Sequence, residues 1–418
     1  MPTSSLALII FAITLIGVAL DRLPWVRVDR PASAFVGAVA MVLFGVLTPR
    51  EAVAAIDWDT IVLLLGMMII IAGLQQDGYT EALAELFLGR AQSARQLLVV
   101  VVAFTGIASA FLVNDVVVLV LTPLLIAHCR AKGLNPVPFL LAEAMASNIG
   151  GTATITGNPQ NMLIGLRSGI SYGGFLLRLL PVAVFSSVVL LAATSWLYRK
   201  ELAHPLTANP AGQRREARAW SRVKPSGIIL VLVILGFLVG RWTGISVPLT
   251  ALAGASLLLA ISRDSPRQIF GRVDWVLLLF FASLFVVVGG AVKGGLVDWA
   301  IRSAPITPGL SGIGFLHGAS LGLSQLISNV PYTVLMAPII EPQGSQLLWL
   351  ALASSATLAG NLTLIGAVAN LIVAERAGQQ GVRVNFWEFF KLGVPVTLLS
   401  LLLSLLVLWG EMALGLLA

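Results

Sequence analysis

The stretch SNIGGTATITGNPQN, residues 147–161, is a polar run in the middle of an otherwise apolar segment. Its glycine pair and internal proline disfavour a continuous helix. A second polar stretch, GNLTLIGAVAN at residues 360–370, interrupts another apolar segment. Backbone groups freed at membrane depth need partners inside the protein or in a water-filled cavity. We therefore predict two broken helices, at 138–165 and 347–374, that contribute to one shared site.

The composition of the chain indicates that these segments lie in a membrane. Of the 418 residues, 58% are hydrophobic and 11% are charged, and the mean hydropathy is +0.95. The 19 acidic and 26 basic side chains are too few for the surface of a soluble protein of this length. They also cluster between apolar runs of bilayer-spanning length. The predicted fold class is therefore an all-α polytopic membrane protein.

Several kinds of chemistry are excluded by what the sequence lacks. Cys129 is the only cysteine, and the three histidines have no metal-site spacing. No phosphate-binding loop and no catalytic triad occur, so we predict neither an enzyme nor a cofactor beyond a coupling ion. The net charge of +7 comes from loops and does not indicate nucleic-acid binding. An external ATPase partner and a homodimer are left open.

The remaining apolar segments predict ordinary helices and two hairpins. The ordinary helices cover 4–20, 33–48, 60–74, 174–197, 227–240, 247–262, 275–292 and 392–416. The stretches 97–128 and 304–340 are too long for one crossing, and each has a polar break near its middle. Both are predicted to be helical hairpins, either re-entrant or fully spanning. The first segment lacks a basic start and a cleavage site, which favours a retained helix over a signal peptide.

The two halves of the chain, 1–197 and 227–418, repeat each other. Three blocks recur at offsets of 217, 215 and 209 residues: Asp57, Gly73 and Gly78 as Asp274, Gly290 and Gly295; Asn114 and Pro123 as Asn329 and Pro338; Gly151, Thr154, Gly157 and Asn161 as Gly360, Thr363, Gly366 and Asn370. Each half has an odd number of crossings besides its hairpin. The halves are therefore predicted to insert in opposite orientations, as an inverted repeat.

The positions of the basic residues predict the orientation. With the N-terminus outside, 20 basic residues lie in inner loops and 6 in outer ones, together the 26 of the chain. The polar segment 198–226 is then a cytoplasmic basic linker. Both termini are predicted on the extracytoplasmic side of the cell (inner) membrane.

Two asparagines and two acids are the strongest candidates for a function at membrane depth. Asn114 and Asn329 stand at the hairpin breaks, where an amide caps a half-helix, binds a solute, or does both. Asp115 is the only acidic or basic residue among the 34 residues between Arg95 and Arg130. A carboxylate at membrane depth is costly, so Asp115 is predicted to couple transport to H⁺, or to Na⁺. Glu143 is a second candidate for proton coupling.

The polar runs themselves allow two interpretations. Small and hydroxyl residues let membrane helices pack closely, but a run of Asn, Thr, Gln and Pro favours a solute site. No Arg or Lys lies in any of the four polar breaks. A neutral or weakly charged solute needs none, whereas a di- or tricarboxylate would depend on amides and helix dipoles.

In these motifs the chain resembles the ion-transporter superfamily of arsenite-efflux permeases, silicon-efflux transporters, Na⁺/H⁺ antiporters and divalent anion–sodium symporters. The resemblance covers nearly the whole chain. It rests on Val113-Asn114-Asp115, the run 147–161, Ser328-Asn329-Val330 and the run 360–370. Asn-Asp in the first hairpin and Gly-Asn-Pro-Gln-Asn after it are most similar to the arsenite and silicon branch. The dicarboxylate branch has Ser-Asn-Thr in both hairpins, and this chain does not.

This resemblance implies a scaffold made of the first three helices of each half. The hairpins and broken helices would form a transport domain that moves by an elevator or rocking motion. It also implies substrate and ion contacts at Asn114, Asp115, Asn148, Thr152, Thr154, Asn158, Asn161, Ser328, Asn329, Asn361, Thr363 and Asn370.

We therefore expect proton-coupled efflux of a small inorganic solute, a metalloid hydroxide or oxyanion such as arsenite or silicic acid. One cysteine cannot supply a multi-thiolate site, so a metalloid would be bound as its neutral hydroxide. A Na⁺/H⁺ antiporter and a sodium-coupled importer of dicarboxylates or other anions are the alternatives. A passive channel is disfavoured by the doubled hairpins.

Overall fold

The computed structural model describes residues 3–20, 29–203, 224–262, 265–303 and 306–417. All regular elements in these ranges are helical. Eight helices are long and apolar enough to cross a membrane, and four shorter apolar helices accompany them. The predicted all-helical membrane class is confirmed. Of the predicted linker 198–226, residues 204–223 lie outside the described ranges.

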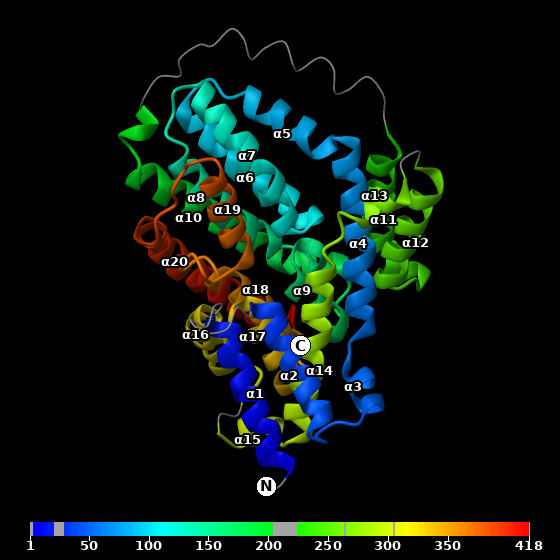
Figure 1. Cartoon of the computed structure of the whole chain (residues 1–418). Coiled ribbons are helices and arrows are strands. Elements are labelled where there is room, and N and C mark those ends of the chain that lie inside the picture. The colour runs from blue at the N-terminus through cyan, green and yellow to red at the C-terminus, as the bar shows by residue number, and fades with distance from the viewer. Residues whose placement is uncertain (1–2, 21–28, 204–223, 263–264, 304–305, 418) are drawn as a thin grey trace.

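The same order of ten helices occurs twice along the chain (Figure 1). The first half contains α1 (Thr3–Leu20), α2 (Arg30–Leu43), α3 (Pro49–Ala55), α4 (Trp58–Asp77), α5 (Tyr79–Gly89), α6 (Ala94–Leu112), α7 (Asn114–Ala131), α8 (Val137–Gly151), α9 (Pro159–Ser168) and α10 (Tyr172–Leu197). The second contains α11 (Pro225–Thr243), α12 (Val247–Ile261), α13 (Pro266–Phe270), α14 (Trp275–Lys293), α15 (Leu296–Ser303), α16 (Leu310–Ile327), α17 (Asn329–Ile340), α18 (Gln346–Ala359), α19 (Val368–Gln379) and α20 (Phe386–Ala413). The short helices α3, α5, α13 and α15 are not among the predicted elements, because none of them is long enough to span a bilayer.

Each stretch predicted as a hairpin forms two helices joined at a single residue. The joints are Val113, with φ 63°, and Ser328, with φ 70°, the only non-glycine residues with positive φ among the described ones. A side chain in this region is strained, most of all a β-branched one, and such strain is retained mainly at functional sites. Asn114 and Asn329 do not take the N-cap positions of α7 and α17, because Val113 and Ser328 occupy them. The Asn114 amide bonds elsewhere, whereas the Asn329 Oδ1 accepts from the Val330 N–H at 2.9 Å, within the first turn of α17.

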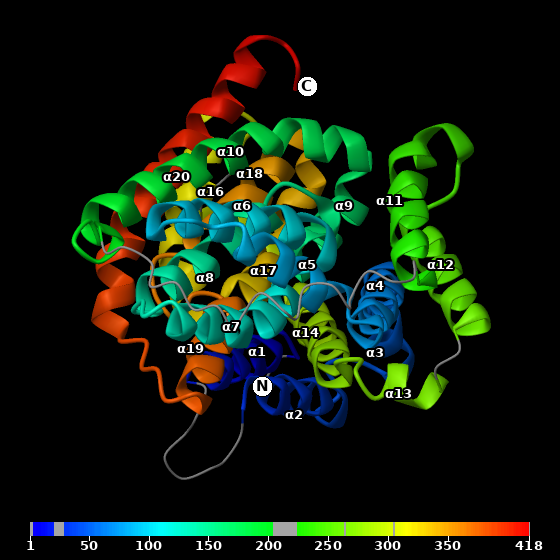
Figure 2. The same ribbon diagram turned by 90° about the horizontal axis from the view of Figure 1, so that it is seen from above.

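The two halves interlock through their fourth helices. α4 packs against α11 and α12 of the second half, and α14 packs against α1, α2 and α3 of the first. The hairpins and broken helices pack mainly against one another and against α10 and α20, and α9 and α17 also contact α4 and α14, respectively. Figure 2 shows α11 and α12 beside α4 at one side of this second group. The interface between the two groups positions the candidate site.

The crossing of α6 and α8 depends on two glycines. A Cβ on Gly150 would lie 2.1 Å from the carbonyl oxygen of Gly106, which is far too close. Small residues at such crossings let two backbones approach in a membrane. We expect Gly150→Ala to cost about 1–3 kcal/mol or more by overpacking, measured as a lower melting temperature of the purified protein. Gly314→Ala is the control, because its Cβ would meet nothing within 4 Å. Equal melting temperatures of the two variants would contradict this account.

Candidate functional site

A cavity of about 220 Å³ lies where four helices begin. The first residues of α7, α17, α9 and α19 line it: Asn114, Asp115, Asn329, Val330, Pro159, Gln160 and Val368. A helix N-terminus has unpaired N–H groups and a partial positive charge of roughly +0.5. The cavity therefore offers donors to electron-rich oxygen atoms. Asp115 adds one carboxylate among these positive helix ends.

The opposite wall of the cavity comes from α2 and α14. Asp29 and Asp274 are exposed at the rim, and Arg30 lines the cavity beside them. The sequence shows no cation in the polar breaks themselves. The fold brings Arg30 to the cavity from the start of α2, more than eighty residues before Asp115. The side chains of the lining thus include one cation and three carboxylates, counting Asp115.

An amide network joins the first hairpin to the second half of the chain. The Asn114 Nδ2 donates to Asn148 Oδ1 at 3.0 Å. The Asn148 Nδ2 donates to Asn361 Oδ1 at 2.8 Å and to Asn370 Oδ1 at 3.0 Å. All four side chains are buried. The Asn114 Oδ1 is buried and has no partner among the described residues, and Asn114 is one of the residues that line the cavity.

Asn161 and Asn370 hold the two breaks together in the same way. The Asn161 Nδ2 donates to the carbonyl oxygens of Gly151 at 3.0 Å and Thr154 at 3.1 Å. The Asn370 Nδ2 donates to those of Gly360 at 2.8 Å and Thr363 at 3.1 Å. These bonds satisfy carbonyl groups that the broken helices leave unpaired. Both side chains therefore stabilise the breaks.

The other predicted contact residues bond to protein groups near the cavity. The bonds are Thr152 Oγ1 to Asn148 O at 3.0 Å, Thr154 Oγ1 to Ala110 O, Asn158 Nδ2 to Thr357 Oγ1 at 3.3 Å, Thr363 Oγ1 to Gln325 Oε1 at 2.7 Å and Ser328 Oγ to Asn329 Oδ1 at 3.3 Å. Among the residues predicted to contact solute, only Asn114, Asp115 and Asn329 line the cavity.

The structure places Glu143 outside the cavity and Gln160 in its lining, and neither position was predicted from the sequence. Glu143 is fully buried on α8 and accepts from Thr122 Oγ1 at 2.9 Å, but it does not line the cavity. Gln160 lines the cavity and was not singled out, although it lies in the Gly-Asn-Pro-Gln-Asn motif. Its Nε2 donates to Thr357 Oγ1 at 3.2 Å. Asp29 and Arg30 carry no signal of a site in the sequence because they lie at the start of a helix after a loop, and Asp274 stands out only as the repeat counterpart of Asp57.

Comparison with known proteins assigns the chain to a family. The family model described as "Citrate transporter" matches residues 6–354. The chain belongs to the citrate transporter family. This citrate transporter family member is therefore a multi-pass integral membrane transporter and not an enzyme.

Several relatives match this citrate transporter family member over nearly its whole length. An uncharacterised transporter of Mycobacterium tuberculosis is 35% identical over 97% of this chain and 98% of its own. The silicon efflux transporter LSI3 of Oryza sativa is 31% identical over 90% of this chain and 91% of its own. The putative transporter arsB of Dictyostelium discoideum is 27% identical over 95% and 90%. The YdaH transporter of Alcanivorax borkumensis shares the fold, with a TM-score of 0.57 and 15% identity over 99% of this chain and 98% of that one.

Proposed function

We propose that this transporter exports a small neutral metalloid hydroxide, such as arsenous or silicic acid, in exchange for protons. The observation that carries the proposal is the pairing of two acceptors with four helix N-termini at one cavity. The Asn114 Oδ1 and the Asp115 carboxylate accept hydrogen bonds, and the helix ends donate them. A molecule with several hydroxyl groups has both the donors and the acceptors that this lining requires. The similarity to the silicon efflux transporter of rice and the putative transporter arsB of Dictyostelium supports the same class of solute.

Asp115 is the residue that we propose couples solute binding to proton binding. Within the described residues, the structure gives Asp115 no salt bridge or hydrogen-bond partner, so its carboxylate is available to the cavity. An ionised carboxylate accepts hydrogen bonds from hydroxyl groups on both of its oxygens, whereas a protonated carboxyl group has an O–H donor and fewer acceptor sites. Proton and solute therefore compete for Asp115. Competition of this kind is the requirement for antiport.

In this conformation the cavity opens to one face of the molecule, and we assign that face to the cytoplasm. Asp29 and Asp274 form its rim on the face where Lys224, at the end of the linker, pairs with Asp77 at 3.5 Å. The distribution of positive charges favours a cytoplasmic position for that face. We propose that the hairpins and broken helices then move against α1, α2, α4, α11, α12 and α14 in an elevator or rocking motion. The halves would be related as an inverted repeat, which is a common basis for alternating access.

A second candidate is a carrier of citrate or a similar anion. The family description and the positive helix ends favour it, and Arg30 could pair with a carboxylate. The carboxylates of Asp29, Asp115 and Asp274 at the same cavity oppose it, since each would repel a polyanion.

A melting-temperature screen of the purified transporter distinguishes these candidates. Arsenite, silicic acid, Na⁺, succinate and citrate are each added at pH 6 and at pH 8. We expect the metalloid hydroxides to raise the melting temperature, because a ligand at 100 times its Kd adds about 2.7 kcal/mol of stability. The effect should be larger at pH 8 than at pH 6, because fewer protons then compete with the solute for Asp115. Stabilisation by citrate or succinate alone would favour the anion carrier. Stabilisation by Na⁺ alone would favour a Na⁺/H⁺ antiporter.

A further inference from the structure

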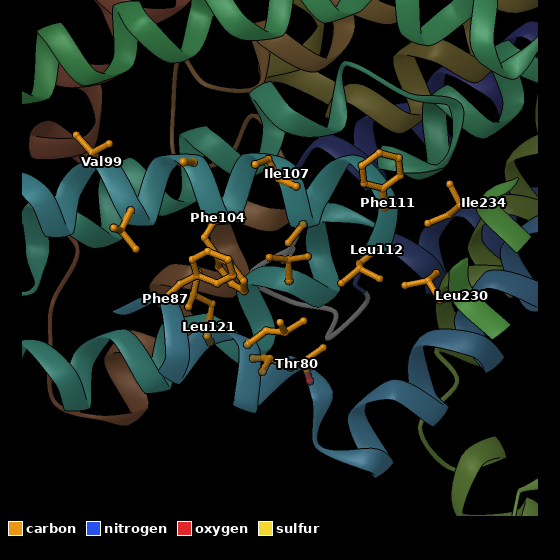
Figure 3. A pocket seen from close by; sticks show the side chains of 17 residues that line it. Thr80, Phe87, Val99, Phe104, Ile107, Phe111, Leu112, Leu121, Leu230 and Ile234 are labelled. Carbon is orange, nitrogen blue, oxygen red and sulfur yellow. The ribbon is translucent and has the colours of Figure 1, made fainter. Parts of the chain in front are cut away.

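A second, larger cavity of about 480 Å³ lies on the other side of the first hairpin. Its lining is apolar except for Thr80 and comes from α5, α6, α7 and α11. Figure 3 shows the side chains extending from Val99 at one end, past Phe87, Phe104 and Leu121, to Leu230 and Ile234 at the other. Val99 is 51% and Ile107 67% exposed. The cavity therefore opens sideways, toward the hydrocarbon of the bilayer.

The cavity separates helices whose counterparts touch in the other half. α1 and α11 are the first helices of the two halves, and α6 and α16 are the sixth. α16 packs against α1, whereas α6 and α11 lie on two sides of the apolar cavity. In water, an apolar space of this size would collapse or bind an apolar ligand. At membrane depth, the available apolar ligand is a lipid chain. The cavity is elongated, which suits an extended chain better than a compact solute.

Two exposed arginines lie at the end of the cavity near Val99. The Arg90 guanidinium carbon is 5.6 Å from the ring centroid of Phe87, a residue of the lining. Arg95 precedes Val99 by one turn of α6 and so lies on the same face of that helix. Basic residues at a membrane surface attract anionic lipid head groups. The apolar lining suits the acyl chain of an anionic lipid, and the two arginines at the entrance suit its head group.

We propose that this cavity binds one acyl chain of an anionic phospholipid whose phosphate group is held by Arg90 and Arg95. The lipid comes from the leaflet on the linker side. It fills the space between the first hairpin and α11, and so holds these two parts of the molecule apart. This site is separate from the solute cavity and does not depend on the proposed solute.

Native mass spectrometry of the full-length protein, purified in mild detergent and supplemented with phosphatidylglycerol or phosphatidylcholine, tests the proposal. We expect one retained phosphatidylglycerol, and weaker retention of phosphatidylcholine with the same chains. Arg90→Gln and Arg95→Gln should each lower retention roughly fivefold, since each cation near the surface contributes about 1 kcal/mol. Ala103→Phe, or Ala108→Phe if the first does not fold, should remove the bound lipid by filling the cavity.

The control is the double variant Arg383→Gln/Lys391→Gln, which removes two exposed charges away from the cavity. It should retain the lipid as the wild type does. The proposal is overturned if this control loses as much lipid as the Arg90 and Arg95 variants. It is also overturned if a folded cavity-filling variant, with a melting temperature near that of the wild type, retains the lipid unchanged.

Discussion

Replacing Asp115 with asparagine is expected to abolish proton-driven transport in proteoliposomes, with a fall of about a hundredfold or more. An amide cannot release a proton, so the competition between proton and solute disappears. If Asp115 couples solute to protons as proposed, lowering the pH should weaken solute binding in the wild type. In the variant, solute binding should no longer depend on pH over the same range. Uptake driven by an imposed pH gradient and binding at pH 6 and 8 measure the two effects.

Asp298→Asn is the matched control, because Asp298 is an exposed acid on α15 away from the cavity. It should transport as the wild type does. The free energy of unfolding of the Asp115 variant should stay within about 0.5 kcal/mol of the wild-type value, since the side chain forms no hydrogen bond or salt bridge within the described part of the protein. Its melting temperature should therefore be nearly unchanged. Unchanged pH dependence in a folded Asp115 variant would refute the coupling role.

Replacing Asn148 with leucine is expected to destabilise the protein and abolish transport together. Asn148 accepts from Asn114 and donates to Asn361 and Asn370, so its loss leaves three buried groups without these bonds. Each unsatisfied buried group costs about 1–3 kcal/mol, although hydrogen bonds inside membranes tend to the lower end. We expect a total of roughly 2–5 kcal/mol, seen as a lower melting temperature. The first hairpin would lose its amide link to the second half and keep the packing of α7 against α19.

A double-variant comparison separates the network from ordinary packing. If the bond to Asn361 matters, Asn361→Leu should cost less in the Asn148 variant than in the wild type. Additive losses would show that the two side chains act independently. Asn135→Leu is the control, because Asn135 lies outside the network and only accepts from Val137 N at 3.1 Å. Its cost should stay near 1 kcal/mol, the value of a lost cap.

Much of the architecture could be read from local sequence features. Apolar runs of bilayer length predict helices, since no other open structure satisfies the backbone in lipid. Gly-Asn-Pro-Gln-Asn interrupts its helix because proline lacks an N–H, and the amides around it supply substitute partners. The positions of Asn114 and Asn329 at hairpin breaks could be found in the same way. The N-cap positions could not be found, because Val113 and Ser328 occupy them with a strained backbone that is not visible as a residue preference.

The sequence by itself determined that this chain is a helical membrane protein with two similar halves and four polar interruptions. Those properties depend on residues close together in the chain. Only the tertiary structure decided which polar groups meet. It placed Asp115 in a cavity with Arg30 and Asp274, joined Asn148 to Asn361 and Asn370, and left Glu143 buried away from that cavity. These pairings depend on how helices from the two halves interlock, and side-chain spacing along one segment carries no information about that packing.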